Sequence, residues 1–421
     1  MIHMLLPREI MGEIFEEHTK LEWKAPAIDG RVCRIWRQIV LNTPRAWRYL
    51  EISEGEPPRI REWREWLHRS GLATSHIRVT SDSTLDKHIN EQTLHELLSG
   101  YYTRIATLRL PWGGPSFFET RTFPCLRALE VTRWYSTHSP IRLVRWKSMR
   151  KLRFLRLAAT ETFPLQWSEL TRLEVLILSS TTITSLPRHS QSLVTLMLHN
   201  VSFEDAISNP VVFPSLTYLS LNGVIGLKPY INAPCLANYD ERGDTIRESF
   251  SSPLPSLRKY GVYDPSFSDL DQAKWHHLFP NVLRLSIRVV SFLFIAFLAS
   301  LSSDPHSLPV LRTISARGLS KPFTEEEQRT MKRLAQIRME TYRDFRLCFE
   351  KKLPFQIPLF FGEVSYCLSC DYECSDLFSR TRRFISKGCR PEPGHINPPR
   401  TPRRHAKNCH RAWVRLSFLA P

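Results

Sequence analysis

Two stretches in the middle of the chain, Leu193–Leu198 (LVTLML) and Leu216–Leu221 (LTYLSL), share one pattern and decide the fold. Each carries apolar residues at its first, fourth and sixth positions, and the central leucines, Leu196 and Leu219, are 23 residues apart. Alternation at the end of the second stretch, where Leu219 and Leu221 flank Ser220, is typical of a β-strand with one buried face. Recurrence at this spacing predicts stacked repeats that each contribute one short strand.

The same pattern returns along most of the chain, with neighbouring copies 20 to 29 residues apart. A weaker, earlier copy is Ile77–Val79. The central apolar residues of the copies are Leu108, Leu129, Leu155, Leu176, Leu196, Leu219, Tyr239, Tyr260, Leu285 and Ile314. The spacing is that of leucine-rich repeats, and the chain resembles the irregular members of that class. The alternative is a generic globular α/β domain.

Proline supports the repeat at a second, fixed position. Six prolines each stand five residues before a central apolar residue, where they would begin the turn into the strand without removing a ladder hydrogen bond. These are Pro124, Pro214, Pro234, Pro255, Pro280 and Pro309.

Side chains that point outward from successive strands would line the concave face of such a repeat protein, which is the surface these proteins use for recognition. The residues next to the central leucines form an amphipathic set without a catalytic constellation. We expect this set to contact a protein target: Arg109, Glu130, Arg156, Ile177, Met197 and Ser220, followed by Gly261 and Ser286.

The first fifty residues predict a small helical module. Pro7 is placed for the first turn of a helix with Ile10, Ile14 and Phe15 on its apolar face. A second amphipathic helix is expected over Val32–Val40, and it should stop at Thr43-Pro44 because the residue before proline avoids the α region. A module this small cannot bury so many large apolar side chains alone, which implies a partner or a larger body.

These residues resemble the F-box, in the form abundant in mushroom-forming (basidiomycete) fungi. The resemblance departs from the family in two places: residues 24–30 are poor in leucine, and Ala46 stands where a leucine usually precedes the tryptophan. It implies docking on a Skp-type adaptor and, through it, on the cullin of an SCF ubiquitin ligase. The implied adaptor-binding residues, including the small core behind them, are Leu6, Pro7, Ile10, Ile14, Phe15, Val32, Cys33, Trp36 and Trp47. The alternative is a helical cap that seals the repeats and binds nothing.

The end of the chain changes character. Thr324–Glu327 is a capping-box pattern that should open a long charged helix, reaching to about Lys352 and covering the last repeat. Residues 380–421 hold eleven of the Lys and Arg residues against one acid, so the net charge of +17 belongs mainly to a tail that we expect to be disordered. Its cysteines, beginning with Cys367 and Cys370, are expected to be unpaired thiols rather than zinc ligands.

No nucleotide-binding, metalloprotease or nucleophile-elbow motif occurs in the sequence, so we expect no enzyme, no cofactor and no metal site. The longest apolar run, Val289–Leu301, is too short to span a membrane and should be buried. With no recognisable signal peptide and nine cysteines, we expect reduced thiols, a cytoplasmic or nuclear location, and no membrane partner.

The expected fold is α/β, with an F-box over residues 1–52, a leucine-rich-repeat solenoid over 53–320, a capping helix over 321–355 and a tail over 356–421. The expected function is substrate recognition in an SCF ligase, with a Skp-type adaptor, cullin and an unknown protein target as partners. Two alternatives stay open: a non-catalytic solenoid scaffold, and a nucleic-acid-associated protein acting through its basic tail, although nucleic acid is not the expected partner.

Overall fold

The computed structural model describes most of the chain up to residue 349. The described residues are 6–53, 59–80, 91–111, 117–118, 121–134, 146–159, 162–163, 165–204, 209–242, 249–263, 278–288, 291–303, 308–317, 324–341 and 345–349. The tail predicted for residues 356–421, with its cysteines and basic residues, lies outside them.

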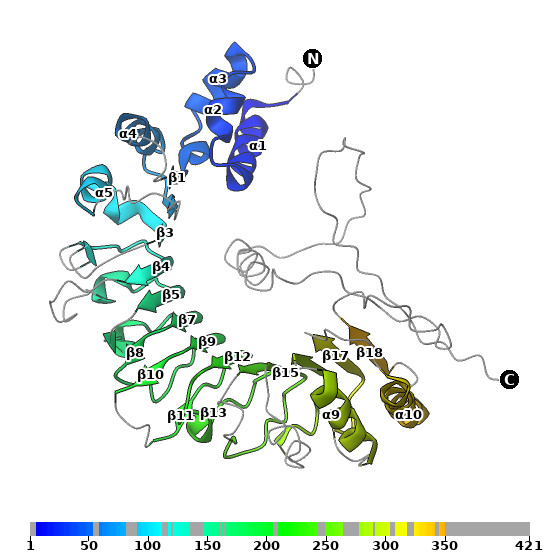
Figure 1. Cartoon of the computed structure of the whole chain (residues 1–421). Coiled ribbons are helices and arrows are strands. Elements are labelled where there is room, and N and C mark those ends of the chain that lie inside the picture. Colours follow the sequence, from blue (N-terminus) through cyan, green and yellow to red (C-terminus); the bar gives the residue numbers. More distant parts are fainter. Residues whose placement is uncertain are drawn as a thin grey trace. The chain divides into compact units, whose positions relative to one another are not determined.

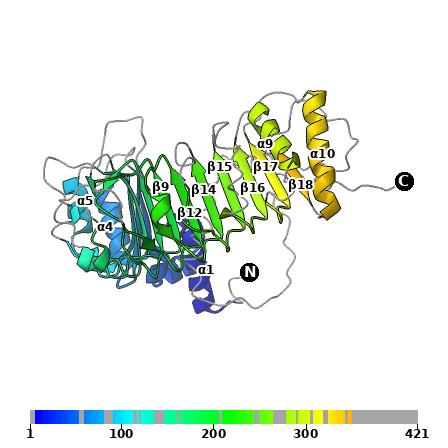
Figure 2. The same cartoon turned by 90° about the horizontal axis from the view of Figure 1, so that it is seen from below.

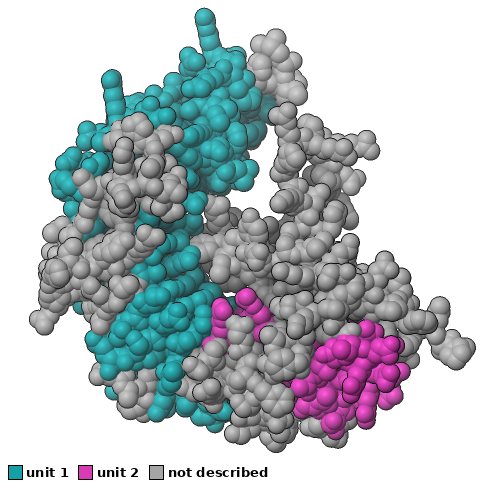
Figure 3. Space-filling view, in the orientation of Figure 1, with its two compact units in different colours: residues 1–236, 248–252 teal, residues 237–247, 253–421 magenta. Residues whose placement is uncertain are grey.

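The architecture is a mixed α/β fold built on a 13-stranded parallel sheet whose strands follow chain order (Figure 1). The chain divides into two compact units, which are described separately below (Figure 3). Unit 1 comprises residues 1–236 and 248–252, and unit 2 comprises residues 237–247 and 253–421. A repeat-like α/β fold with one sheet strand per repeat is therefore confirmed.

Unit 1 begins with helices and continues into strands. Its helices are α1 (Arg8–Leu21), α2 (Ala25–Asp29), α3 (Arg34–Leu41), α4 (Ile60–Arg69) and α5 (Glu91–Leu98), with short 3-10 turns at Pro44–Trp47, Tyr102–Arg104, Trp146–Met149, Trp167–Glu169 and Lys228–Tyr230. Its strands in the main sheet are β1 (Tyr49–Ser53), β2 (Ser75–Thr80), β3 (Ile105–Leu110), β4 (Ala128–Trp134), β5 (Phe154–Ala159), β7 (Val175–Ser179), β9 (Thr195–His199) and β12 (Tyr218–Asn222). Two smaller sheets join β6 (Thr162–Phe163), β8 (Thr182–Ile183) and β10 (Ser202–Phe203), and β11 (Val211–Val212) with β13 (Ile231–Asn232).

Unit 2 contains five strands of the main sheet and two helices. The strands are β14 (Asn238–Arg242), β15 (Lys259–Tyr263), β16 (Arg284–Arg288), β17 (Thr313–Arg317) and β18 (Arg346–Phe349); the helices are α9 (Ser291–Ser303) and α10 (Glu325–Thr341). Figures 1 and 2 both show α9 and α10 side by side. The apolar run near residue 295 forms α9, whose Phe294 and Leu298 are buried, as its composition predicts.

The predicted central residues all occupy equivalent places in the sheet. In unit 1 the register pairs Leu196 with Leu219, and in unit 2 it pairs Tyr239 with Tyr260. A slip of one residue would turn every such side chain from the core to the outward face, so burial of this row fixes the register. The other register partners continue the two rows: Leu108, Leu129, Leu155 and Leu176 in unit 1, and Leu285 and Ile314 in unit 2.

The prolines act as the sequence predicts. Pro124 is the second residue of a turn in which the N–H of Leu126 donates to the carbonyl oxygen of Phe123 at 3.1 Å, and Phe123 is fully buried. Proline suits this position because its fixed φ matches the turn and it has no N–H to lose. The same hydrogen bond closes the turns at Pro214, Pro234, Pro255, Pro280 and Pro309.

Three element boundaries differ from the sequence predictions. The sheet begins at Tyr49, inside the range assigned to the helical module, because β1 pairs in parallel with β2. The second helix begins at Arg34, with Cys33 as its N-cap. Pro7 is likewise the N-cap of α1 and does not lie within its first turn.

The predicted C-terminal helix is correct at its start and wrong at its end. The backbone N–H of Thr324 donates to Oε2 of Glu327 at 2.6 Å, and the Glu327 N–H donates to Oγ1 of Thr324 at 3.3 Å, which is a capping box. The helix stops at Thr341 rather than near Lys352. Residues Arg346–Phe349 instead form β18, because the open edge of β17 supplies hydrogen-bond partners for an extended chain.

Candidate functional site: the helical module and the outward sheet face

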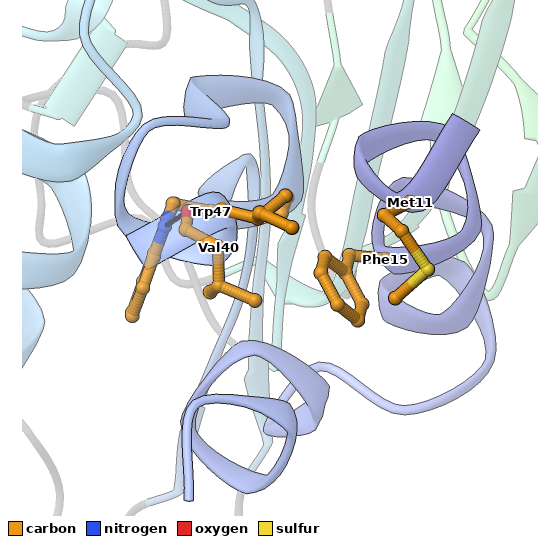
Figure 4. Packing of buried hydrophobic residues seen from close by; sticks show 6 residues of the cluster. Met11, Phe15, Val40 and Trp47 are labelled. Carbon is orange, nitrogen blue, oxygen red and sulfur yellow. Dashed lines mark hydrogen bonds between the residues drawn. The ribbon is translucent and has the colours of Figure 1, made fainter. Parts of the chain in front are cut away.

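The helical module closes around its own small core. Met11 and Phe15 from α1 point toward Val40 of α3 and toward Trp47 (Figure 4). The Trp47 indole donates through Nε1 to the carbonyl oxygen of Val40 at 2.9 Å, so its one polar atom is satisfied inside the core. Trp36 packs at the edge, with its ring 5.2 Å from that of Phe15.

The leucine-poor middle of the module folds as a helix despite its composition. Residues Ala25–Asp29 form α2, with Pro26 in the first turn where helices tolerate it. Asp29 is buried and lies 3.1 Å from Nδ1 of His18, so α2 is held to α1 by a polar contact. Ala25 and Ala46 are fully buried, which indicates close packing at both departures from the F-box pattern.

A large apolar surface remains outside this core. Residues 6–41 expose eight large apolar side chains, whereas the rest of the described chain exposes three. Helical periodicity places Ile10, Ile14 and Leu21 on one face of α1, away from the buried Met11 and Phe15. The eight side chains are Leu6, Ile10, Ile14, Leu21, Ile28, Val32, Ile35 and Leu41; we call them the apolar surface of the module.

The nine residues predicted for adaptor binding separate into three groups. Phe15 and Trp47 belong to the core, and Cys33 and Trp36 are half-buried, with the backbone N–H of Trp36 donating to the Cys33 Sγ at 3.4 Å. The exposed group comprises Leu6, Pro7, Ile10, Ile14 and Val32.

Sequence reasoning missed four members of the apolar surface, namely Leu21, Ile28, Ile35 and Leu41. For Leu21 a signal existed, because it continues the Ile10 and Ile14 face by helical spacing.

Aromatic residues connect the module to the first strand within unit 1. Trp66 of α4 donates through Nε1 to the carbonyl oxygen of Tyr49 at 2.9 Å, and its ring lies 4.7 Å from that of Trp47. The guanidinium of Arg69 stands over the Trp47 ring at 4.6 Å, and Glu16 pairs with Arg48 at 2.6 Å. The module is therefore joined to β1 by packed rings, a hydrogen bond and an ion pair.

The residues predicted for the concave face of unit 1 align in one row, but Met197 and Ser220 are buried, so the prediction that they contact a target is wrong for these two. The register aligns Arg109, Glu130, Arg156, Ile177, Met197 and Ser220 on successive strands β3, β4, β5, β7, β9 and β12. Glu130 is shared by two guanidiniums, at 3.4 Å from Arg109 and 3.1 Å from Arg156. The row is charged over β3–β5 and turns apolar at Ile177 and Met197. In unit 2, Gly261 and Ser286 are also register partners.

Next to this row, His76 of β2 is held neutral. Its ring stacks on Tyr49 at 4.6 Å, and its Nδ1 lies 3.0 Å from the Thr107 hydroxyl. Burial and then the positive charges of nearby Arg48 and Arg127 lower the pKa of His76 to about 3. This residue was not singled out by the sequence pattern.

A second unforeseen feature lies in the core of unit 2. Glu241 occupies the position at which the other repeats carry an apolar residue, most often leucine, and it is 2% exposed. Its carboxylate accepts a hydrogen bond from the Tyr239 hydroxyl at 2.6 Å and another from the Tyr260 hydroxyl. A buried carboxylate is tolerated where such donors satisfy it.

The comparisons with known proteins give no family for this chain. No protein-family model matches it, and no curated protein matches it significantly. Within the described residues no group of three or more His, Cys, Asp or Glu side chains is arranged to hold a metal ion. Among the helices that the structure describes, none has both the length and the apolarity to cross a bilayer.

Proposed function

We propose that this chain is the substrate-recognition subunit of an SCF-type ubiquitin ligase. The helical module of residues 6–47 would dock on a Skp-type adaptor, and the outward face of the sheet would hold a protein target. The chain then contributes proximity, while catalysis belongs to the other subunits. The proposal starts from the resemblance of the first fifty residues to the F-box and of the remainder to leucine-rich repeats.

The observation that carries the proposal is the apolar surface of the module. The core of the module consists of Met11, Phe15, Ile39, Val40, Ala46 and Trp47, and the eight exposed side chains lie outside it. A concentration of exposed large apolar side chains in one small module favours an interaction site there. Side chains from α1 to α3 provide the anchor residues that helical recognition uses.

The test is co-expression of the chain with a Skp-type adaptor, followed by co-purification. The variant Ile10→Asp/Ile14→Asp places two charges on the apolar surface while leaving the buried residues unchanged. Its matched control is Leu72→Asp/Ile225→Asp, because Leu72 is 93% and Ile225 66% exposed and both lie outside the module. We expect the native chain and the control to retain the adaptor and the module variant to lose it. Failure of the native chain to retain any Skp-type adaptor would refute the proposal.

A further inference from the structure

Arginine dominates the outward face at the beginning of the sheet. Three arginines and two glutamates share the outward row of β1–β5, and three further arginines immediately precede β1, β4 and β5. They are Arg48, Arg78, Arg109, Arg127, Arg153 and Arg156, with Glu51 and Glu130; we call this set the arginine face.

Ion pairs join members of the set to one another and to two glutamates beside it. Glu51 lies 3.8 Å from Arg78, and Glu130 serves both Arg109 and Arg156. Arg48 pairs with Glu16, and Arg153 pairs with Glu174 at 3.4 Å. The set itself therefore contains six guanidiniums and the two carboxylates of Glu51 and Glu130, so arginine outnumbers glutamate among its members.

The surroundings of His76 are also rich in positive charge. After burial, the influences that lower its pKa are all cationic: Arg48, Arg127, Arg109 and Lys20. The neutral imidazole of His76, stacked on the ring of Tyr49, provides a flat and uncharged surface beside the guanidiniums. The arginine face therefore combines positive charge with planar guanidinium donors on the strands of the sheet.

We propose that the arginine face binds an extended acidic segment of the target, with Asp or Glu carboxylates on Arg78, Arg109 and Arg127. Guanidinium groups match carboxylates through paired parallel hydrogen bonds, which ammonium groups do not provide. Arg78 and Arg127 are exposed and Arg109 is half-buried, so all three have surface from which to donate. The inference rests on the proposal that the sheet face holds a protein target, and it names the chemistry of that target.

The test measures fluorescence anisotropy of a labelled peptide of alternating Glu and Ala residues, using the full chain. The variant Arg78→Glu/Arg127→Glu reverses two charges on the arginine face. The control Arg329→Glu/Arg333→Glu makes the same change of charge on exposed residues of α10. The basic residues 380–421 are the same in every protein, so any binding by them contributes equally. Thermal unfolding of each variant checks that the fold is kept.

We expect the peptide Kd to rise about tenfold or more in the face variant and to stay unchanged in the control. Equal affinity of the native chain and the face variant would overturn the inference. The inference would also be overturned, in favour of a nucleic-acid surface, if the native chain bound single-stranded oligothymidylate more tightly than the peptide and the face variant lost that binding. Adaptor co-purification from the same samples separates the two proposals. If the native chain retains the adaptor but the face variant binds the peptide as tightly as the native chain, only the acidic-target inference is refuted. If the native chain does not retain the adaptor but the face variant loses peptide binding, only the SCF proposal is refuted.

Discussion

The indole Nε1 of Trp47 donates a hydrogen bond of 2.9 Å to the carbonyl oxygen of Val40, and this contact ties the end of α3 to the 3-10 turn Pro44–Trp47 that precedes β1. Both residues are almost fully buried. The hydrogen bond therefore lies at the end of the helical module, next to the first strand of the sheet.

Replacing this indole should weaken the junction by two separable amounts. Trp47→Phe keeps most of the ring but leaves the Val40 carbonyl without this donor, and we expect a loss of about 1–3 kcal/mol in the free energy of unfolding. Trp47→Ala also opens a cavity and should cost about 3–5 kcal/mol. Urea unfolding followed by tryptophan fluorescence and circular dichroism measures both. Equal losses for the two variants would show that the ring volume does not matter at this site.

Glu241 should be more important for stability than its charge suggests. Glu241→Leu restores the usual repeat residue but removes the acceptor of the Tyr239 and Tyr260 hydroxyls, so we expect a loss of about 1–3 kcal/mol. Glu241→Gln keeps the shape and one oxygen acceptor and should lose less. Chemical denaturation of the three proteins provides the comparison. A leucine variant more stable than the native chain would contradict this account of the site.

Gly223 is required by both its backbone and its neighbour. Its φ is +61°, and a Cβ there would collide with Oδ1 of Asn200. Gly226 has a φ of +81° but nothing within 4 Å of an added Cβ, so it isolates the backbone term. We expect Gly226→Ala to cost about 1–2 kcal/mol and Gly223→Ala to cost clearly more. Thermal unfolding of the pair tests this, and equal melting temperatures would argue against a steric role for Asn200.

His76 should make stability fall in mild acid. Its pKa is about 3 in the folded chain and 6.5 when unperturbed, so between these values the unfolded chain binds a proton that the folded chain does not. Stability is then greatest above pH 6.5 and decreases as the pH falls, by at most ~1.4 kcal/mol per pH unit and by less because His76 is only half-buried. His76→Gln should lose this contribution. Urea midpoints of the native chain and the His76→Gln variant between about pH 7.5 and 5 measure this pH dependence. A difference in midpoint between the two proteins that stays constant with pH would contradict it.

The sequence predicts the repeat well because the repeat depends on local residue patterns that recur at regular spacing. Leu196, Leu219 and Tyr239 could be placed from the pattern alone, since each strand faces the core with the same alternation. Pro124 and its counterparts could be placed because a turn restricts φ at one residue. Neither prediction depends on which distant segment supplies the packing.

The features that could not be predicted depend on distant partners. Strand β18 exists because β17 offers a free edge, which nothing near Arg346 reveals. Glu241 breaks the apolar pattern, and its burial is explained by partners such as the hydroxyls of Tyr239 and Tyr260 on its own and the next strand.

The helical module posed a different difficulty, because α1 is apolar on two faces. Periodicity groups Ile10 with Ile14, and Met11 with Phe15, but it does not say which pair faces the core. The structure buries Met11 and Phe15 and leaves Ile10 and Ile14 exposed. The candidate adaptor surface therefore loses Phe15 and Trp47 to the core and gains Leu21, Ile28, Ile35 and Leu41.

Hydrogen exchange of the full chain with and without a purified Skp-type adaptor tests the central claim most directly. The account predicts slower exchange on adaptor binding in α1, α2 and α3, and unchanged exchange in β5, β7 and β9. The Ile10→Asp/Ile14→Asp variant should show neither complex nor protection. Protection confined to the strands, or no protection of the helical module at a saturating adaptor concentration, would contradict it.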